Sequence, residues 1–535
     1  MSLAPEHLSP PLAGGTTEKN LTASWRHLKP VYRELISPCR EECAAGVRPE
    51  RFLHHLSRGK VKEAFYVILE AHPFPAIMGR VCYRECEKKC TRDHFDGAVA
   101  IGSLERIAGD RAIEERFDLG LPVRKNAGRA GVIGAGPAGL SFLYHMRKAG
   151  FDVTLFDMKM APGGMLRHVI PDYRLPSKVV DAEIGRLLGG GINFVRKRFA
   201  LEGIVGMERE FDILLVATGA WQSTLSFQHE EGSSGISDAI RFLQRAKESP
   251  ISLKGKKVLV VGGGNSAIDS ARAAIRLGAD VDLFYRRDER DMPAYEEEVE
   301  EAVKEGVQFH FRVAPRSPLF EKRRIRGVKM IRTDVIRGKD TGPRGKVIAR
   351  EGTEFEIPCD LLILATGEDA AFSENQIKVG KHLYIAGDAM RNATRNVTWA
   401  LGSGKEAALS FLSNAGLIDE KGKDEKHREV AGADTINRDY VRPSTRLKSK
   451  AIPIARRIRT FDEVENTPTF EDGMIEAGRC LSCGVCNGCD NCRIFCPDGA
   501  VRWNGGDYSV EYDHCKGCGI CWTECPGGAI SFTEG

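Results

Sequence analysis

Eight cysteines near the C-terminus form two runs with the same spacing. In each run three cysteines are separated by two residues, and a fourth follows after three more, directly before a proline. The runs are Cys486, Cys489, Cys492 and Cys496, then Cys515, Cys518, Cys521 and Cys525. Three thiolates on a tight loop can ligate one [4Fe-4S] cube, while the cysteine before proline reaches the other cube. We therefore predict two [4Fe-4S] clusters that exchange their fourth ligands and transfer single electrons.

Two alternative uses of these cysteines are weaker. Zinc needs only two Cys-x-x-Cys pairs per ion, whereas here a longer pattern ending in Cys-Pro occurs twice. A disulfide framework is typical of secreted proteins. We expect neither a secretory leader nor a membrane span, since the sequence shows no apolar run of about 18 residues. The expected location is cytoplasmic, with reduced thiols.

The composition is typical of a large enzyme with several domains. Of the 535 residues 42% are hydrophobic and 57 are glycine, so the chain can form three or four cores joined by tight turns. The formal net charge of +4 gives no reason to expect nucleic acid or an anionic membrane as a partner. Local basic patches remain a way to dock an acidic redox protein.

Residues 129–157 predict a strand, a glycine turn, a helix and a second strand. The turn reads Gly134-Ala-Gly136-Pro137-Ala138-Gly139, and the second strand ends at Asp157. The first glycine makes the turn, the second lets a pyrophosphate approach the backbone, and the third lets helix pack on strand. The carboxylate of Asp157 would accept hydrogen bonds from the ribose hydroxyls. Glycine turns also serve packing alone, but the flanking strands and the acid favour a dinucleotide site.

A second copy of this motif lies at residues 257–287. Its turn contains Gly262, Gly264, Asn265 and Ser266, and Tyr285, Arg286 and Arg287 follow its second strand. Tyr285 stands where the acid would be. Guanidinium groups bind a 2′-phosphate that an acid would repel, so this site is predicted to prefer NADP(H). Alternatively, the arginines cap a helix or pair with Asp288 and Glu289.

Three further stretches complete the pattern. Residues 214–219 and 361–367 are apolar strands ending in Ala-Thr-Gly, and residues 383–388 form an apolar strand ending in Gly-Asp. This arrangement resembles the flavoproteins with two dinucleotide-binding domains. Residues 161–176, with Tyr285-Arg-Arg and Met292-Pro-Ala, more closely resemble the glutamate synthase small-subunit family. That family includes the flavin part of dihydropyrimidine dehydrogenase, the large subunit of NADH-dependent ferredoxin:NADP oxidoreductase and flavin subunits associated with sulfite reductase or 2-oxoacid oxidoreductases.

The resemblance implies a multidomain α/β protein that binds FAD at the first fingerprint and NADP(H), or alternatively NAD(H), at the second. The expected parts are a helical Fe-S domain (1–115), an FAD domain (116–225 and 355–417) with an inserted NAD(P)H domain (226–354), a charged linker (418–478) and a ferredoxin-like α+β domain (479–535). Besides the residues already given, the implied cofactor contacts are Gly163, Gly164, Arg167, Thr218, Gly219, Thr366, Gly367, Gly387, Asp388, Val397 and Thr398.

The N-terminal cysteines match the cluster domain of this family incompletely. The chain has Cys39, Cys43, Cys82, Cys86 and Cys90, while two further cysteine positions of the family carry Val31 and Glu34. A motif like the missing one occurs at Cys480 and Cys483. We therefore expect these two thiols to fold back and complete a cluster with Cys39 and Cys90. The alternative is that they are spare thiols and that one N-terminal cluster forms.

A further cluster would be held by Cys43, Cys82 and Cys86 with an oxygen ligand. In relatives a glutamine or glutamate fills this place, and the matching segment contains Glu105. Fifteen cysteines, all except Cys359, and one carboxylate then supply sixteen ligands, which suffices for four cubes. Alternatively, Glu105 is an ordinary acid on a helix face. Cys359 is expected to pack in a core, so the chain has no dithiol to take electrons from the flavin.

These parts predict hydride transfer between NADP(H) and FAD, followed by single-electron steps through the clusters. No catalytic protein acid or base is required for the hydride step. The favoured hypothesis is that the chain is an electron-transfer subunit in a larger redox complex of the glutamate synthase, sulfite reductase or 2-oxoacid oxidoreductase type. The alternatives are a stand-alone NADPH:ferredoxin oxidoreductase and a non-catalytic relay. The expected partner is a ferredoxin or a catalytic subunit, in an oligomer or hetero-complex.

Overall fold

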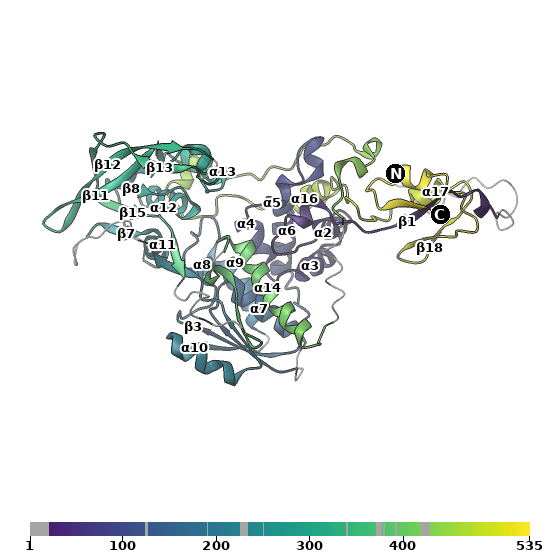
Figure 1. The fold of residues 1–535 in the computed structure, drawn as a ribbon. Coiled ribbons are helices and arrows are strands. Elements are labelled where there is room, and N and C mark those ends of the chain that lie inside the picture. Colours follow the sequence, from purple (N-terminus) through teal and green to yellow (C-terminus); the bar gives the residue numbers. More distant parts are fainter. Residues whose placement is uncertain are drawn as a thin grey trace.

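The computed structural model describes residues 21–122, 127–189, 191–224, 234–249, 251–338, 341–370, 377, 380–390, 393–418 and 429–534. The described chain is elongated (Figure 1): the second dinucleotide-binding domain forms one end, the ferredoxin-like domain forms the other, and the N-terminal helices and first dinucleotide-binding domain lie between them. Within the described ranges, every helix is too short or too polar to span a bilayer.

The N-terminal domain is a cluster of helices joined by short turns. Its elements are α1 (Pro38–Glu41), α2 (Pro49–Leu56), α3 (Val61–Leu69), α4 (Pro75–Val81), α5 (Glu85–Lys88) and α6 (Ile101–Glu114). Two glycines let α4 and α6 touch through their backbones. A Cβ on Gly109 would lie 2.1 Å from the Ala76 nitrogen, and one on Gly79 would lie 2.4 Å from Arg106 Cβ. This contact fixes α6, which carries Glu105.

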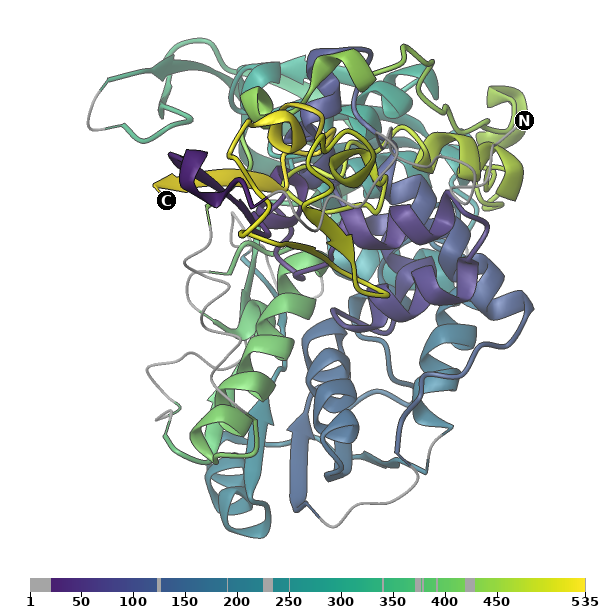
Figure 2. The same cartoon turned by 90° about the vertical axis from the view of Figure 1, so that its right-hand side faces the viewer.

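The first dinucleotide-binding domain contains a parallel five-stranded sheet. Its strand order is β17 (Leu383–Ile385), β5 (Ile213–Val216), β2 (Arg129–Ile133), β3 (Asp152–Asp157) and β4 (Asn193–Arg196). The helices are α7 (Pro137–Lys148), α8 (Met165–His168), α9 (Ser177–Leu188), α10 (Leu201–Met207) and α14 (Val397–Asn414). Figure 2 shows α14 running alongside α7. The Asn396 side chain caps α14 by accepting a hydrogen bond from the Trp399 nitrogen.

The second domain repeats this architecture. Its parallel sheet has the order β10 (Gln308–Phe311), β9 (Asp280–Tyr285), β8 (Lys257–Val261), β15 (Leu361–Leu364) and β7 (Ile236–Asp238). Its helices are α11 (Ala239–Glu248), α12 (Asn265–Arg276) and α13 (Glu296–Lys304). A second, antiparallel sheet contains β11 (Val313–Glu321), β12 (Arg324–Ile336), β13 (Lys346–Ala349) and β14 (Phe355–Pro358).

The two connections between these domains lie together. Strand β6 (Ala220–Ser223) leaves the first domain and pairs antiparallel with β16 (Glu368–Ala370), which returns to it. The Ala-Thr-Gly turns are therefore neighbours, and the Thr366 hydroxyl donates to the Thr224 carbonyl (2.7 Å). The predicted fold class, with one dinucleotide-binding domain inserted in the other, is confirmed.

The ferredoxin-like domain is completed by a strand from the other end of the chain. Its own elements are α17 (Asn491–Ile494), β18 (Val501–Trp503), β19 (Tyr508–Val510), α18 (Ile520–Thr523) and β20 (Ile530–Glu534). Strand β1 (Leu28–Tyr32) pairs antiparallel with β20 over all five residues of both strands. Figure 1 accordingly shows β1 running into this domain, at one end of the molecule.

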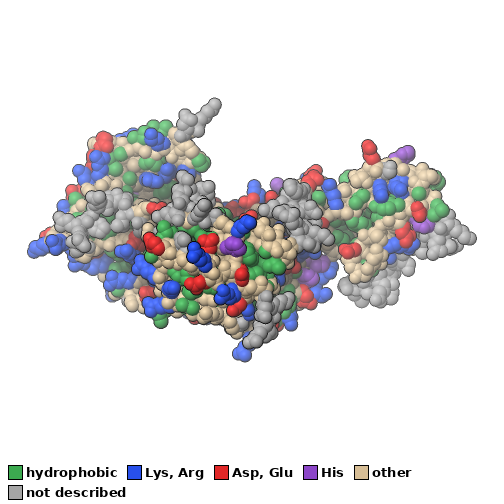
Figure 3. All heavy atoms as spheres, turned by 60° about the horizontal axis from the view of Figure 1, so that its bottom comes forward, with side chains coloured by type: hydrophobic (Ala, Val, Ile, Leu, Met, Phe, Trp, Pro, Cys, Tyr) green, Lys and Arg blue, Asp and Glu red, His purple; other side chains and the backbone are tan. Residues whose placement is uncertain are grey.

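Residues 429–478 connect α14 to the ferredoxin-like domain along the N-terminal helices. They contain α15 (Ile454–Arg457) and α16 (Phe470–Ala477). Ion pairs hold them in place, since Arg80 contacts Glu463 (2.6 Å) and Arg446 contacts Glu87. On the face in Figure 3, cationic and anionic side chains are interspersed over the middle of the molecule. Over the middle of that face, the residues that the structure describes form no extended surface of one charge.

Candidate cluster and dinucleotide sites

In the glycine turn after β2, two glycines have no space for a side chain and the third does. A Cβ on Gly134 would lie 2.2 Å from the Ala217 carbonyl oxygen, and one on Gly139 would lie 1.9 Å from the Gly134 oxygen. At Gly136 the nearest atom would be 4.0 Å away, on Gly164. Packing therefore requires the outer glycines, while the middle one leaves room at the N-terminus of α7. This cradle fits the pyrophosphate of a dinucleotide.

Polar groups gather around this cradle. Asp157 Oδ2 accepts a hydrogen bond from the Ala135 nitrogen (2.7 Å), which ties the end of β3 to the glycine turn. Thr218 Oγ1 and Asp388 Oδ1 are buried and have no hydrogen-bond partner among the described residues. Burial raises the pKa of Asp388 to about 6, against the opposing effect of Arg395. Unpaired buried polar atoms are costly, and the ribityl and phosphate groups of a flavin would supply their missing partners.

The segment after β3 forms another wall of the same cradle. The Gly163 nitrogen donates to the Ala135 carbonyl (2.8 Å). Gly164 has a φ of +52°, and a Cβ there would lie 2.7 Å from Gly136 Cα. Arg167 donates to the Pro162 carbonyl and contacts Asp181, so it holds this loop together. Gly219 (φ +70°), Gly367 (φ +125°) and Gly387 (φ +67°) all have left-handed backbones.

The second glycine turn differs from the first in its surroundings. A Cβ on Gly262 would lie 2.4 Å from the Ala365 oxygen, and one on Gly263 would lie 2.4 Å from the Tyr285 ring, whereas Gly264 faces open space. The Asn265 side chain donates to the Tyr83 hydroxyl (2.7 Å) and accepts from the Tyr295 nitrogen (3.0 Å). Asn265 thus joins the turn to the cluster domain. Ser266 follows it in the first turn of α12.

Three arginines gather beyond β9. Arg287 donates to the carbonyls of Arg344 (3.1 Å) and Gly345 (3.3 Å), which draws the loop between β12 and β13 towards β9. Burial, then the charges of Arg287 and Arg344, lower the pKa of Arg286.

The nearby acid has other partners. Asp288 accepts from Arg312 and pairs with Arg337 (3.2 Å), so it does not neutralise this arginine group. Three neighbouring cations without a carboxylate partner in the described structure fit a 2′-phosphate.

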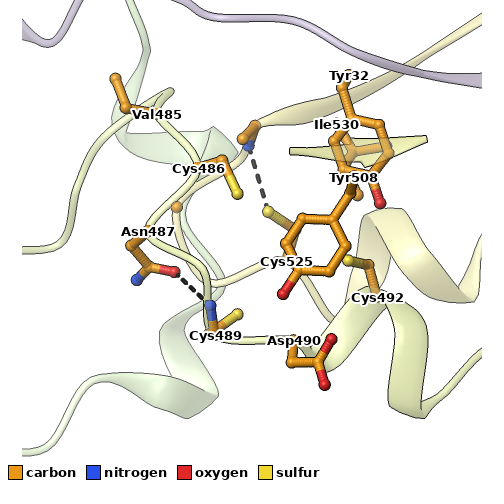
Figure 4. A pocket seen from close by; sticks show the side chains of 12 residues that line it. Tyr32, Val485, Cys486, Asn487, Cys489, Asp490, Cys492, Tyr508, Cys525 and Ile530 are labelled. Carbon is orange, nitrogen blue, oxygen red and sulfur yellow. Dashed lines mark hydrogen bonds between the residues drawn. The ribbon is translucent and has the colours of Figure 1, made fainter. Parts of the chain in front are cut away.

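The thiols of Cys486, Cys489, Cys492 and Cys525 line one cavity, here called site A. Figure 4 shows these side chains around a common space bordered by the rings of Tyr32 and Tyr508. The Ala529 nitrogen donates to Cys525 Sγ (3.3 Å). Tyr32 comes from β1, so the N-terminal strand supplies a wall of a C-terminal cavity. The structure brings together the four thiols that the sequence pattern predicted as one ligand set.

The other four ferredoxin thiols also lie together, at what we call site B. Burial and the neighbouring thiolates of Cys496, Cys515 and Cys518 raise the pKa of Cys521 to about 12. The Ala500 nitrogen donates to Cys496 Sγ (3.3 Å), as the Ala529 nitrogen does at Cys525. Cys492 and Cys521 pack in the same small core, so sites A and B are adjacent.

A second cavity is lined by Cys39, Cys90, Cys480 and Cys483, here called site C. Cys480 follows α16, whose Glu476 accepts hydrogen bonds from the Ala100 nitrogen (2.8 Å) and from Arg479 (2.8 Å). Arg479 also pairs with Asp96 (2.9 Å). These contacts dock residues 476–483 on the N-terminal domain. The distant thiols of the C-terminal motif therefore join the N-terminal ones, as the ligand count predicted.

Three thiols and a carboxylate gather at a fourth place, here called site D. Burial, followed by the charge of Glu105, raises the pKa of Cys82 to about 12. Burial also raises the pKa of Cys43, and Glu105 adds to this effect. For Cys86, burial and then the charges of Cys82 and Cys43 have the same effect. Glu105 also lies beside His72, whose Nε2 is 3.0 Å from Glu105 Oε1.

All sixteen cysteines are free of disulfides. Among the described residues, no three His, Cys, Asp or Glu side chains converge as ligands of a single metal ion would. The cavities at sites A and C, each lined by four thiols, suit a larger group. Thiolates with one carboxylate, as at site D, are donors that an iron-sulfur cube accepts.

Two dinucleotide-binding folds, preceded and followed in the sequence by thiol sites, define an iron-sulfur flavoprotein oxidoreductase. The family model for pyridine nucleotide-disulphide oxidoreductases matches residues 129–405. The model for dihydropyrimidine dehydrogenase domain II, with a 4Fe-4S cluster, matches residues 34–117, and that for a 4Fe-4S binding domain matches residues 508–531.

Curated relatives agree with these models. The chain is 31% identical to the beta subunit of NADP(+)-dependent formate dehydrogenase from Moorella thermoacetica, over 88% of this chain and 74% of that protein. It is 31% identical to the small chain of glutamate synthase [NADPH] from Azospirillum brasilense, over 69% and 84%. It is 33% identical to the beta subunit of NADPH-Fe(3+) oxidoreductase from Geobacter sulfurreducens, over 63% and 52%.

The chain belongs to the pyridine nucleotide-disulphide oxidoreductase family, among relatives of the glutamate synthase small chain. It is an NAD(P)H oxidoreductase that uses FAD and [4Fe-4S] clusters. The predicted family and cofactor types are confirmed.

Several residues at these sites were not predicted from the sequence. Tyr32, Tyr83 and Arg344 lie far along the chain from the motifs that they contact, while Glu50 lies 11 residues after Cys39 of site C. A hint existed for Tyr83, which follows a predicted ligand directly. For the other three, the local sequence carried no comparable signal.

Proposed function

We propose that this chain carries electrons between NADP(H) and a protein partner through FAD and four clusters held at sites D, C, A and B. Bound FAD exchanges a hydride with nicotinamide and single electrons with iron-sulfur clusters. The protein's own groups bind and orient these cofactors. Fifteen cysteines and Glu105 supply the ligands in this proposal.

The single observation that carries this proposal is a contact between the flavin-binding and cluster-binding parts. Thr398, at the start of α14, lies 3.3 Å from Cys82 Sγ through its hydroxyl. Asp388 and its unpaired oxygen precede the same helix. Site D therefore lies beside the cradle assigned to FAD, and it is the entry to the row of clusters.

The remaining sites follow in a row. Cys39 of site C contributes to raising the pKa of Cys86 at site D, after burial and nearer charges. Two residues separate Cys483 of site C from Cys486 of site A, and Cys492 of site A packs with Cys521 of site B. This succession supports the order D, C, A, B. Electrons would leave near site B, where Cys518 is exposed.

The surface around site B suits a protein acceptor. Phe495 and Trp522 flank site B ligands in sequence and are 48% and 53% exposed. Exposed aromatic side chains are enriched at protein interfaces. Two of the relatives reported above are beta subunits and one is a small chain. We therefore propose that this chain is the electron-transfer subunit of a larger redox complex.

The dinucleotide is proposed to be NADP(H). The support is the group formed by Arg286, Arg287 and Arg344, whose neighbouring acid Asp288 is neutralised by other arginines. All three relatives reported above are named for NADP(+) or NADPH.

Anaerobic reduction tests the proposed path. NADPH added to the purified holoprotein should bleach the flavin absorbance and then produce electron paramagnetic resonance (EPR) signals of reduced clusters. Clusters that stay oxidised while the flavin is fully reduced, with low-potential mediators present, would contradict it. Recovery of the native protein as a monomer without a co-purifying subunit would contradict the complex and leave the path intact.

A further inference from the structure

Glu50 places a buried carboxylate against site C. Its side chain is 1% exposed and lines the same cavity as the four thiols. Oε2 accepts a hydrogen bond from the Ser37 hydroxyl (2.9 Å). Oε1 has no hydrogen-bond partner in the described structure. Glu50 is in the first turn of α2, where the helix dipole favours a negative charge. The helix dipole thus supports this carboxylate, whose ion pair with Arg48 is long at 4.0 Å.

The cations near Glu50 have other partners. The Nε of Arg48 lies 4.0 Å from Glu50 Oε1, while the other two nitrogens of this guanidinium contact Glu34 (3.1 Å) and Glu70 (3.6 Å). Arg92 also lines the cavity but donates to Asp96 (2.6 Å) and to backbone carbonyls. Because both arginines also contact other carboxylates, they neutralise the negative charge of Glu50 beside site C only in part.

Ser37 connects this carboxylate to a predicted cluster ligand. Its Oγ lies 3.4 Å from Cys39 Sγ and 2.9 Å from Glu50 Oε2. A hydroxyl has one hydrogen to donate, and the carboxylate is the stronger and nearer acceptor. Glu50 thus draws the hydroxyl hydrogen away from the sulfur. Hydrogen bonds to sulfur and local charge both set cluster potentials.

We propose that Glu50, acting with Ser37, lowers the reduction potential of the site C cluster. Reduction adds one electron to the cluster, and a negative charge held nearby in a poorly polarisable interior opposes that step. Withholding a hydrogen bond from Cys39 acts in the same direction. Glu50 is a positioning and tuning residue, not a ligand, and this inference rests on the proposed function.

Redox titration of the complete holoprotein tests this role. We would compare Glu50→Gln, which removes the charge at nearly constant volume, with Glu50→Asp, which keeps it. The matched control is Glu42→Gln, which removes an exposed acid close to the same ligands in sequence. EPR-monitored titration with dithionite gives the cluster midpoint potentials, and Cys90→Ser identifies the site C signal by its loss.

In Glu50→Gln the site C midpoint should shift to higher potential, with the other midpoints unchanged. Glu50→Asp and Glu42→Gln should leave it close to the wild-type value. An unchanged midpoint in Glu50→Gln, or an equal shift in Glu50→Asp, would overturn the inference. If Glu50→Gln loses the cluster, Glu50→Asp decides, since a shifted site C midpoint there contradicts a role of the charge. An iron content that shows no site C cluster in the wild type would instead contradict the proposed function.

Discussion

Tyr32 and Ile530 face each other in an antiparallel strand pair that joins the first and last strands of the described chain. The N-terminal part of the chain thus contributes a strand to the C-terminal domain. Conversely, Cys480 and Cys483 line a cavity with Cys39 and Cys90 of the N-terminal domain. The Leu35 nitrogen also donates to the Gly484 carbonyl (2.9 Å). Each cluster domain is therefore completed by a segment of the other, which holds the two domains together.

Removal of residues 1–32 should disrupt sites A and B, because it deletes the partner of β20 and the Tyr32 wall of site A. We expect bound iron to fall from about 16 to about 8 atoms per chain, measured by iron and sulfide analysis. Removal of residues 1–20 keeps every described contact of β1 and serves as the control. Full iron retention in the longer deletion would show that the strand is dispensable.

Substitution of Arg286 and Arg287 by alanine should weaken the binding of NADPH far more than the binding of NADH. Each charge-assisted hydrogen bond contributes about 1.5–3 kcal/mol, so the NADPH dissociation constant should rise on the order of 10–100-fold or more. Stopped-flow reduction of the flavin at varied NADPH and NADH gives both constants. Arg290→Ala, three residues away, is the control. Equal losses for the two nucleotides would mean that these arginines do not read the 2′-phosphate.

Glu105→Ala should change the spectrum and potential of one cluster, or reduce iron to about 12 atoms per chain, because site D then has only three thiolates. Glu105→Gln keeps an oxygen donor and should retain more of the cluster. The control is Glu114→Ala at the other end of α6, where the side chain is 64% exposed. Unaltered iron content, spectra and midpoints in Glu105→Ala would leave Glu105 without a ligand role.

Asp388 should make the flavin-free protein less stable as the pH rises. Burial raises its pKa from 3.8 to about 6, so the folded state binds this proton more tightly than the unfolded state. The resulting stabilisation is complete below pH 3.8 and is lost as the pH passes 6, a change of about 3 kcal/mol.

Melting curves of flavin-depleted wild type and Asp388→Asn between pH 4 and 8 would measure this change. The stability difference between the two proteins should vary with pH over that range, and Asp388→Asn should bind FAD more weakly. A pH-independent difference would contradict a buried, unpaired carboxylate at this position.

The fold could be predicted to a large extent because its signals are local. The spacing of Gly134, Gly136 and Gly139 predicts a turn between a strand and a helix independently of the rest of the chain. The same is true of Gly262 and Gly264. The ligand sets of the clusters stay predictions, although the structure brings each set together. Tyr83 and Arg344 were not predicted, because their contacts with Asn265 and Arg287 depend on how segments far apart in the chain pack together.

The sequence by itself determined which cofactors this protein binds, since cysteine spacing and glycine turns act over a few residues of backbone. Only the tertiary structure decided how the cofactor sites are connected. It paired β1 with β20, set Thr398 against Cys82 and buried Glu50 beside site C. Contacts between segments hundreds of residues apart follow from the packing of whole domains, and no short pattern in the chain encodes them.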